Sequence, residues 1–146
     1  MRERHQAIAF LLVWAASLVL LLSGIAAVTP KPVLPATASA VRLLVHGPSW
    51  SIDYEASTQN NTAFGLLREA NETLGFELRW TPYGWPYHDV LVTSINGTAS
   101  DSGRNLWWQY CVDGTYASVG AANQEIRSGD VVTWIYTAPG GDELCA

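Results

Sequence analysis

The stretch Leu106–Thr137 reads LWWQYCVDGTYASVGAANQEIRSGDVVTWIYT, and its pattern predicts three strands joined by two tight turns. Asp113-Gly114 has the composition of a two-residue hairpin loop, because such a loop requires positive φ at both central residues and Asp and Gly tolerate that conformation best. Ser128-Gly129-Asp130 predicts the second turn by the same chemistry. We expect the rest of the fold to be built around this unit.

The Asp113-Gly114 turn predicts a register in which Val112 pairs with Thr115 and the pairing continues outward to Trp108 opposite Val119. Because side chains alternate between the faces of a strand, one apolar face is expected to lie on the core: Trp108, Tyr110, Val112, Ala117 and Val119. The other face joins aromatic rings to hydrogen-bonding groups: Trp107, Gln109, Cys111, Tyr116 and Ser118. Such an amphipathic face suits contact with a small molecule or a protein, and its coverage by a second sheet or by the C-terminal tail is an equally open interpretation.

The composition of the 146-residue chain favours one small folded domain behind a targeting segment. Hydrophobic residues make up 49% of the chain, with seven Trp, six Tyr and three Phe, which is enough to form a core. From Val41 onward five Arg stand against twelve acidic residues, a net charge of −7 with His neutral. Nucleic acids and anionic lipid surfaces are bound by clustered Lys and Arg, so this acidic balance argues against both as partners.

Residues 1–28 predict a membrane-targeting helix. Two Arg residues precede an uncharged run, Ala7–Val28, whose 22 residues would span about 33 Å as a helix, enough for the hydrocarbon core of a bilayer. That length favours an uncleaved signal anchor with its Arg-flanked end in the cytoplasm, while small residues at Gly24–Ala26 and Ala38–Ala40 leave open a cleaved signal peptide and a secreted domain. Residues 29–40 contain three Pro and predict a semi-extended linker. In either case the domain is expected outside the cytoplasm.

Export changes the interpretation of the two Cys residues. Outside the cytoplasm a disulfide between Cys111 and Cys145 is the leading interpretation, with free thiols or an intermolecular bridge as alternatives. The disulfide would tie the tail, residues 138–146, back across the amphipathic face. Two Cys without neighbouring His lack the spacing of metal ligands, so no metal site is expected.

The residues before the opening stretch predict a β-hairpin followed by a helix. Val41–His46 and Trp50–Ala56 alternate as paired strands. Over Thr62–Leu74 the apolar residues recur instead at helical spacing, and Gly75 is placed to end the helix in the left-handed conformation. The stripe expected on the core consists of Ala63, Leu66, Leu67, Ala70 and Leu74. Glu69 lies off this stripe and is expected to face water.

Residues 81–89, TPYGWPYHD, form an aromatic segment between two predicted strands, Phe76–Trp80 and Val90–Ile95. Two Pro and one Gly make it too broken for regular structure, and three aromatic residues are unusual for a solvated loop. We interpret it either as the lip of a binding site or as a lid over the edge of the core. Its candidates for ligand contact are Tyr83, Trp85 and Tyr87. Asn96-Gly97, after the second strand, predicts another hairpin turn.

As an ordered set, these features resemble the transcobalamin-like C-terminal domain, the DUF4430 family, and are similar to the C-terminal β-domain of the vitamin B12 carriers transcobalamin and intrinsic factor. The matching pieces are Thr62–Leu67, Phe76, Thr93–Gly97, Trp108-Gln109, Val119-Gly120 and Gly129-Asp130. The resemblance implies an α+β domain of the β-grasp type, with an antiparallel sheet packed on one helix. The expected organisation is then a signal anchor or signal peptide, a linker, the transcobalamin-like domain and a tail, at residues 1–28, 29–40, 41–137 and 138–146.

The resemblance also implies a ligand surface. In the B12 carriers the Trp-Gln strand region faces cobalamin, which is held against a separate helical barrel domain. Carried over, this points to Trp108, Gln109 and their hairpin partners, and Tyr116 is a further candidate because it lies on the same predicted face as Gln109. The predicted register turns Trp107 outward beside Gln109 and makes it a candidate as well. This chain contains no helical barrel, so the resemblance implies one half of a shared cobalamin or corrinoid site.

Catalysis is not expected from the residues available. Past the leader the chain has only His46 and His88, and it has no G-x-S-x-G motif, no H-E-x-x-H motif and no Gly-rich phosphate loop. Two binding functions remain. The first is an exported, membrane-tethered domain that binds cobalamin or a related corrinoid. The second is a cell-surface protein-interaction module whose aromatic residues pack on a partner domain.

Overall fold

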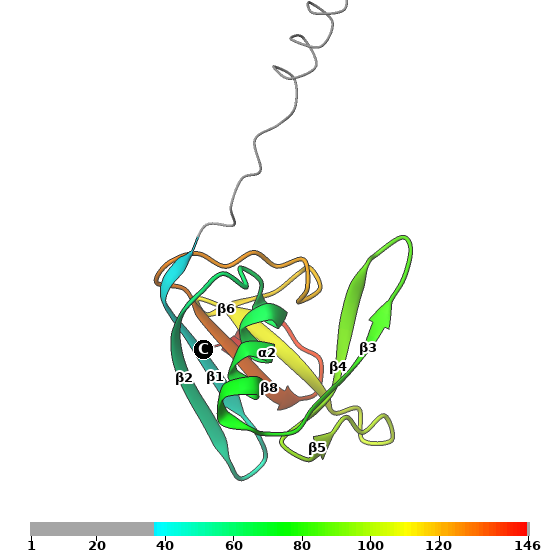
Figure 1. Cartoon of the computed structure of the whole chain (residues 1–146). Coiled ribbons are helices and arrows are strands. Elements are labelled where there is room, and N and C mark those ends of the chain that lie inside the picture. The colour runs from blue at the N-terminus through cyan, green and yellow to red at the C-terminus, as the bar shows by residue number, and fades with distance from the viewer. Residues whose placement is uncertain (1–36, 146) are drawn as a thin grey trace, which may run out of the picture. The chain divides into compact units, whose positions relative to one another are not determined.

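The computed structural model describes residues 37–145, with its elements labelled in Figure 1. In chain order they are β1 Ala38–His46, β2 Ser51–Thr58, α2 Ala63–Leu74, β3 Leu78–Tyr83, β4 Asp89–Ile95, β5 Thr98–Ala99, β6 Trp107–Val112, β7 Thr115–Tyr116, β8 Val131–Thr137 and the 3-10 helix η1 Asp142–Cys145. The predicted targeting helix, residues 1–28, lies outside the described residues, and β1 begins inside the predicted 29–40 linker. No helix within residues 37–145 is both long enough and apolar enough to cross a bilayer.

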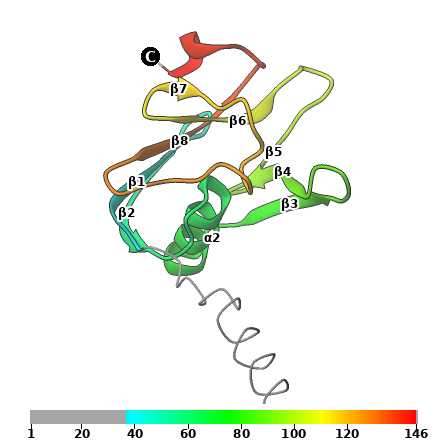
Figure 2. The same ribbon diagram turned by 90° about the horizontal axis from the view of Figure 1, so that it is seen from above.

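Two sheets and one α-helix make up the described domain. The larger sheet has the strand order β2-β1-β8-β6-β7, and the smaller has the order β3-β4-β5. Figures 1 and 2 show α2 lying across one face of the larger sheet, with the β3–β4 hairpin projecting beside it. The core lies between the helix and this sheet, where Leu43 and Val45 of β1 and Leu66 and Leu67 of α2 are fully buried. The α+β class predicted from the sequence is confirmed.

The larger sheet departs from the predicted antiparallel arrangement at its centre. β1 and β8 run parallel, with Leu43 opposite Val132 and Val45 opposite Trp134, whereas the other neighbouring strands are antiparallel. The alternation of side chains indicates which face of a strand is buried, but it carries no information about which distant strand lies beside it. A parallel pair needs a long crossover, and here the chain between the two strands includes α2 and the smaller sheet.

The helix begins and ends where the sequence predicts. Thr62 caps its start, because the threonine hydroxyl accepts a hydrogen bond from the backbone N–H of Gly65 at 3.0 Å. Gly75 ends it with φ of 77° and donates its N–H to the carbonyl of Asn71 at 2.8 Å. The predicted buried stripe is wrong only at Leu74, which is 52% exposed. Periodicity predicts the face of a helix, but not how far the core extends beneath it.

The β3–β4 hairpin contains more of the aromatic segment than predicted. Strand β3 continues through Pro82 to Tyr83, so the irregular part is only residues 84–88. Pro82 is tolerated because β3 is an edge strand, where a missing backbone N–H leaves no neighbour without a partner. The predicted Asn96-Gly97 turn is confirmed, with φ of 47° and 77° at the two residues and β5 pairing back on β4.

The Asp113-Gly114 hairpin is also confirmed, with φ of 50° and 75° at its two turn residues. The predicted long pairing beyond it is wrong. β7 pairs with β6 only through Tyr116 and Thr115, after which one further hydrogen bond joins Ala117 to Tyr110 before the chain turns away. Val119, predicted on the core face, is 49% exposed. The side of β6 that was expected to be covered by a strand is therefore bordered by a loop.

Glu69 does not face water as predicted. Its carboxylate accepts hydrogen bonds from the hydroxyls of Tyr54, at 3.1 Å, and Thr58, and from the side-chain amide of Asn60 at 3.0 Å. These bonds join α2 to the end of β2. Desolvation of the carboxylate raises the pKa of Glu69, but the hydrogen bonds from Thr58, Asn60 and Tyr54 together outweigh it and hold the pKa below its ordinary value of 4.5.

Glu69 is expected to make the fold sensitive to acid. Because its pKa is lowered in the folded state, its stabilisation is complete above the ordinary value of 4.5 and is lost as the pH falls through the lowered value. The free energy of unfolding can be measured with urea at neutral pH and at about pH 3. Its decrease between the two pH values should be smaller in Glu69→Gln than in the wild type. Other carboxylates titrate alike in both proteins. An equal loss in the two would contradict the assignment.

Candidate functional site

Strand β6 presents its residues to two environments, as the predicted register requires. Trp108 and Tyr110 are buried, whereas Trp107 and Gln109 are half-buried. The indole N–H of Trp108 donates to the carbonyl of Thr98 at 2.9 Å, which attaches β5 to the core. Trp108 thus fastens β5 to β6. The accessible side chains next to it on β6 are those of its neighbours Trp107 and Gln109.

A hollow of about 200 Å³ opens beside β6, where β7 has ended. Its walls come from β4, from β6 and from the loop that follows β7. Three of the predicted site residues meet there: Trp108, Gln109 and Tyr116. The hydroxyl of Tyr116 donates a hydrogen bond to the side-chain oxygen of Gln109 across the hairpin. This bond fixes the orientation of the Gln109 amide at the edge of the hollow.

The floor of the hollow combines stacked aromatic rings with a buried donor. Tyr110 and Trp134 both line it, and their rings stack with centroids 5.0 Å apart. The Tyr110 hydroxyl donates to the carbonyl of Val119 at 2.6 Å, and burial, with the charge of Asp89 adding to it, raises the pKa of Tyr110. The indole N–H of Trp134 is buried and has no hydrogen-bond partner within residues 37–145. Buried donors are normally paired, so this N–H is an exception, and the residue that carries it lines the hollow.

The loop that walls the hollow is held by Asp89, the first residue of β4. One carboxylate oxygen of this buried residue accepts hydrogen bonds from the backbone N–H groups of Val90, at 2.7 Å, and Ala122, at 3.0 Å, and the other accepts from the Asn123 side chain at 2.8 Å. Gly120 lies against the same carboxylate, so closely that a Cβ at this position would overlap it. The Val119-Gly120 motif is thereby explained, because only glycine leaves room for the anchoring side chain.

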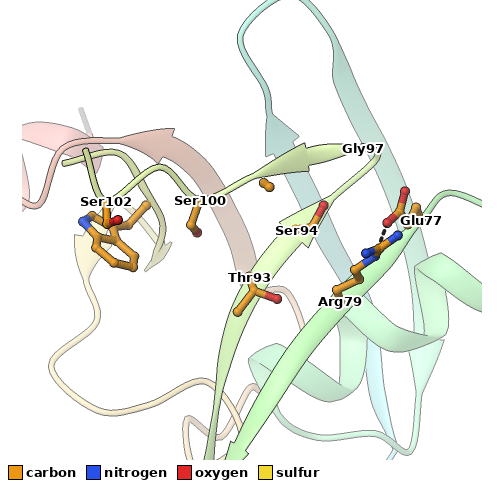
Figure 3. Close-up of a pocket in the computed structure, with 9 residues that line it drawn as sticks. Glu77, Arg79, Thr93, Ser94, Gly97, Ser100 and Ser102 are labelled. Atoms are coloured by element: carbon orange, nitrogen blue, oxygen red, sulfur yellow. Dashed lines mark ion pairs between the residues drawn. The ribbon is translucent and has the colours of Figure 1, made fainter. Parts of the chain in front are cut away.

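Trp107 lies in a different cavity from Gln109 and Tyr116. This second cavity has a volume of about 550 Å³ and lies between β3, β4 and the chain that leads into β6. Figure 3 shows Thr93 and Ser94 on β4 and Ser100 and Ser102 on the following loop, with Arg79 on the adjacent strand. The two cavities share no lining residue. The predicted grouping of Trp107 with Gln109 and Tyr116 is thus split between two places.

The aromatic residues of the β3–β4 hairpin point into solvent. Tyr83, Trp85 and Tyr87 are 49%, 85% and 75% exposed, and they line neither cavity. Such exposure does not fit a lid over the core, and residues outside both cavities do not form the lip of either one. The base of the hairpin nevertheless reaches the loop of the hollow, because the side-chain amide of Asn123 donates to the carbonyl of Tyr87 at 3.2 Å.

The predicted disulfide between Cys111 and Cys145 is present, with a Cα–Cα distance of 5.9 Å. Cys111 is buried, and the carbonyl of Cys145 lies near Gly114 of the hairpin turn. Helix η1 is thus fastened beside β7. Gln109 and Tyr116 still line the hollow, so within the described part of the chain the tail covers Cys111 without closing the hollow.

Metal ligands are not gathered in the described part of the chain. No group of three or more His, Cys, Asp or Glu side chains within residues 37–145 is arranged to hold a metal ion. The polar groups that the two cavities do present are hydroxyls, amides and one ion pair, which suit hydrogen bonding to an organic ligand.

The fold defines a small α+β domain with a hollow at the free side of one strand. Residues 60–138, more than half of the chain, match the DUF4430 family, whose description is a domain of unknown function, and the chain belongs to this family. The resemblance inferred from the sequence is thereby confirmed. No curated protein matches the chain.

Several solved structures share the fold. One is haptocorrin in complex with Cbi, with a TM-score of 0.55 and 14% identity over 75% of this chain and 27% of that one. Another is a candidate metal-binding protein from Ruminococcus gnavus, with a TM-score of 0.55 and 16% identity over 70% of this chain and 99% of that one. The present chain spans about a quarter of the length of haptocorrin. At these identities the likeness concerns the fold.

Sequence reasoning missed the residues that shape the hollow. The sequence pattern places Asp89 only at the end of the aromatic segment and Trp134 only in a strand. The one available signal was Gly120, because a glycine inside a predicted strand can mark close approach by another group. Which group approaches it depends on contacts more than 30 residues apart, which no local pattern contains.

Proposed function

We propose that this chain is an exported, membrane-tethered binding protein whose β-grasp-like domain forms one half of a corrinoid site. The observation that carries the proposal is that Gln109 and Tyr116, joined by a hydrogen bond, lie beside Trp108 on the wall of one hollow. Membership of the DUF4430 family and the fold shared with a haptocorrin that holds Cbi support it. The tether rests on the sequence of residues 1–28 alone.

The chemistry of the hollow suits the periphery of a corrin ring. Corrinoids are broad, flat and partly apolar, and they carry amide side chains around the ring. Gln109 and Tyr116 offer amide and hydroxyl groups to such amides, while stacked Tyr110 and Trp134 offer an apolar surface. None of these groups is arranged as a nucleophile with its base, so the proposed activity is binding without catalysis.

The hollow is too small to enclose a corrinoid. Its volume of about 200 Å³ lies below the range of about 300–1,000 Å³ typical of small-molecule sites. We therefore propose that this domain contacts one side of the ligand and that a second surface, on another domain or another protein, covers the rest. Binding to this chain alone should accordingly be weak, in the range of about 10–100 μM.

A titration of the purified full-length chain with cobalamin and with cobinamide tests the proposal. Binding is expected to quench tryptophan fluorescence and to shift the corrin absorbance. Gln109→Ala should weaken it about tenfold, which corresponds to the loss of one well-formed hydrogen bond to the ligand. Gln59→Ala, the same change at an exposed site after β2, is the matched control and should have no effect. No spectral change with either corrinoid at about 100 μM would refute the proposal.

A second function is favoured by one observation, the exposure of the hairpin tip. Trp85 and Tyr87 are 85% and 75% exposed on a projecting hairpin, and exposed aromatic residues of this kind often dominate protein interfaces. On this alternative the domain is a cell-surface interaction module without a small-molecule ligand. Trp85→Ala should then weaken cross-linking of the chain to its neighbour on intact cells, and Gln109→Ala should not.

A further inference from the structure

We propose that the cavity beside Trp107 binds a neutral saccharide. Its volume of about 550 Å³ falls within the range of about 300–1,000 Å³ found for small-molecule sites. Figure 3 shows the cavity bordered by β4 and its turn on one side and by the loop carrying Ser100 and Ser102 on the other. Since it shares no residue with the hollow beside Gln109, its ligand is independent of the corrinoid proposal.

Four of the nine residues that line this cavity carry a hydroxyl group. These four are Thr93, Ser94, Ser100 and Ser102, which come from β4 and from the loop after β5 (Figure 3). A hydroxyl both donates and accepts hydrogen bonds, so a row of them complements a ligand that itself carries a row of hydroxyls. Saccharides are the biological ligands with that property.

The charges at the cavity indicate a neutral ligand. Glu77 and Arg79 both line it, and they form an ion pair with each other, drawn as a dashed line in Figure 3. Because the two charges compensate, a phosphate or carboxylate would find no free cation to balance it. A sugar hydroxyl can instead accept from the guanidinium and donate to the carboxylate without disturbing that balance, and hydrogen bonds to charged groups are stronger than neutral ones.

Trp107 supplies the apolar surface that a pyranose ring also needs. One face of many pyranoses carries only C–H groups, and an indole face is attractive to such positively polarised hydrogens. The Trp107 ring is half-buried, and its N–H donates to the side-chain oxygen of Asn105 at 3.0 Å. This bond holds the ring in place before any ligand arrives, so little side-chain entropy is lost on binding.

The wall that carries Ser102 and Trp107 is held by its own hydrogen bonds. Asp101 and Leu106 exchange backbone hydrogen bonds at 2.8 and 2.9 Å and close the loop between them. The guanidinium of Arg104 adds a bond to the Asp101 carboxylate at 2.7 Å, and this bond is the main reason that the pKa of Asp101 is lowered. The cavity is thus formed by a closed loop and a strand, in keeping with a preorganised site.

Ser100 provides an additional reason to expect a ligand. Its hydroxyl oxygen is buried and has no hydrogen-bond partner among residues 37–145. A buried hydroxyl left without a partner is destabilising, because it has lost its hydrogen bonds to water and gained none in return. Ser100 itself lines the cavity, so rotation of its side chain toward a ligand hydroxyl would give this oxygen the partner that it lacks.

The test is a binding assay on the full-length chain with named sugars. We would use glucose, galactose, mannose, N-acetylglucosamine, cellobiose, lactose and chitobiose, in a detergent without a sugar headgroup because residues 7–28 are apolar. Ligand-observed NMR should detect at least one with an affinity of about 1 mM, typical of a small site with few contacts. No signal from any of these sugars at about 20 mM would overturn the proposal.

Variants locate the binding in this cavity. Trp107→Ala should weaken it at least tenfold, while Trp85→Ala, the same change at the exposed hairpin tip, should leave it unchanged. Arg79→Gln, at an exposed position, should also weaken it and guards against loss of folding in the tryptophan variant. Sugar binding that survives both cavity changes would place the ligand elsewhere and refute the assignment. Corrinoid titration of Trp107→Ala should match the wild type, so that the two proposals fail or succeed separately.

Discussion

Reduction of the Cys111–Cys145 disulfide is expected to lower the free energy of unfolding by about 4 kcal/mol. The bond joins residues 34 apart in the sequence, and closing a loop of that length removes much of the conformational entropy of the unfolded chain. Its loss also releases η1 from β7, where the carbonyl of Cys145 lies near Gly114. For a small domain whose total stability is about 5–15 kcal/mol, this is among the largest effects available from a single bond.

Guanidinium unfolding followed by tryptophan fluorescence, with and without a phosphine reductant, measures this effect. The control is the variant with Cys111→Ala and Cys145→Ala, whose stability should be low and unaffected by the reductant. Alkylation followed by mass measurement checks the starting state, since native protein should expose no free thiol. Two alkylatable thiols in the unreduced chain, or equal stability before and after reduction, would show that the bridge is not formed.

Local turn and cap chemistry explains which parts of this fold were predictable. Asp113-Gly114 and Asn96-Gly97 each require two consecutive residues at positive φ, and few residue types accept that conformation. Gly75 ends α2 for the same reason, and Thr62 carries the hydroxyl that its first turn needs. These features depend on neighbours within a few residues, so the sequence contains all the information that specifies them.

The parts that could not be predicted depend on distant partners. Nothing in the sequence of Val41–His46 indicates that this strand lies parallel to Val131–Thr137. Each of the two strands would bury the same alternate side chains whichever strand lay beside it. The same reason explains why β7 stops at Tyr116. The β pattern continues through Val119, but Asp89 binds the loop that follows and draws it away from β6.

The candidate site divides in the same way. Gln109 and Tyr116 were predicted to lie on one face because they flank a recognisable two-residue turn, and the structure joins them by a hydrogen bond. Trp107 was grouped with them by alternation alone. It lies instead beside the hydroxyl-lined cavity, whose other walls come from β3, β4 and the loop after β5. The alternation of side chains along a strand predicts the face on which a residue lies. The segments that pack beside the strand determine which residues that face contacts.

Gly120→Ala is expected to lower the free energy of unfolding by about 3 kcal/mol or more. The added methyl group would overlap the Asp89 carboxylate, which is buried and cannot move without leaving the backbone N–H groups of Val90 and Ala122 unpaired. Each unpaired buried donor costs about 1–3 kcal/mol. The same substitution should abolish corrinoid binding, because the loop that it displaces forms a wall of the hollow beside Tyr116.

Two comparisons separate this mechanism from a general loss of backbone freedom. Gly84→Ala is the matched control, because a Cβ there meets no atom within 4 Å, and its stability should stay within about 0.5 kcal/mol of the wild type. In the Asp89→Ala background, where the overlapping carboxylate is gone, Gly120→Ala should cost much less than it does alone. Equal costs in the two backgrounds would mean that Gly120 is required for a reason other than its contact with Asp89. The double-mutant cycle thus measures directly whether a single carboxylate holds the loop that shapes the hollow.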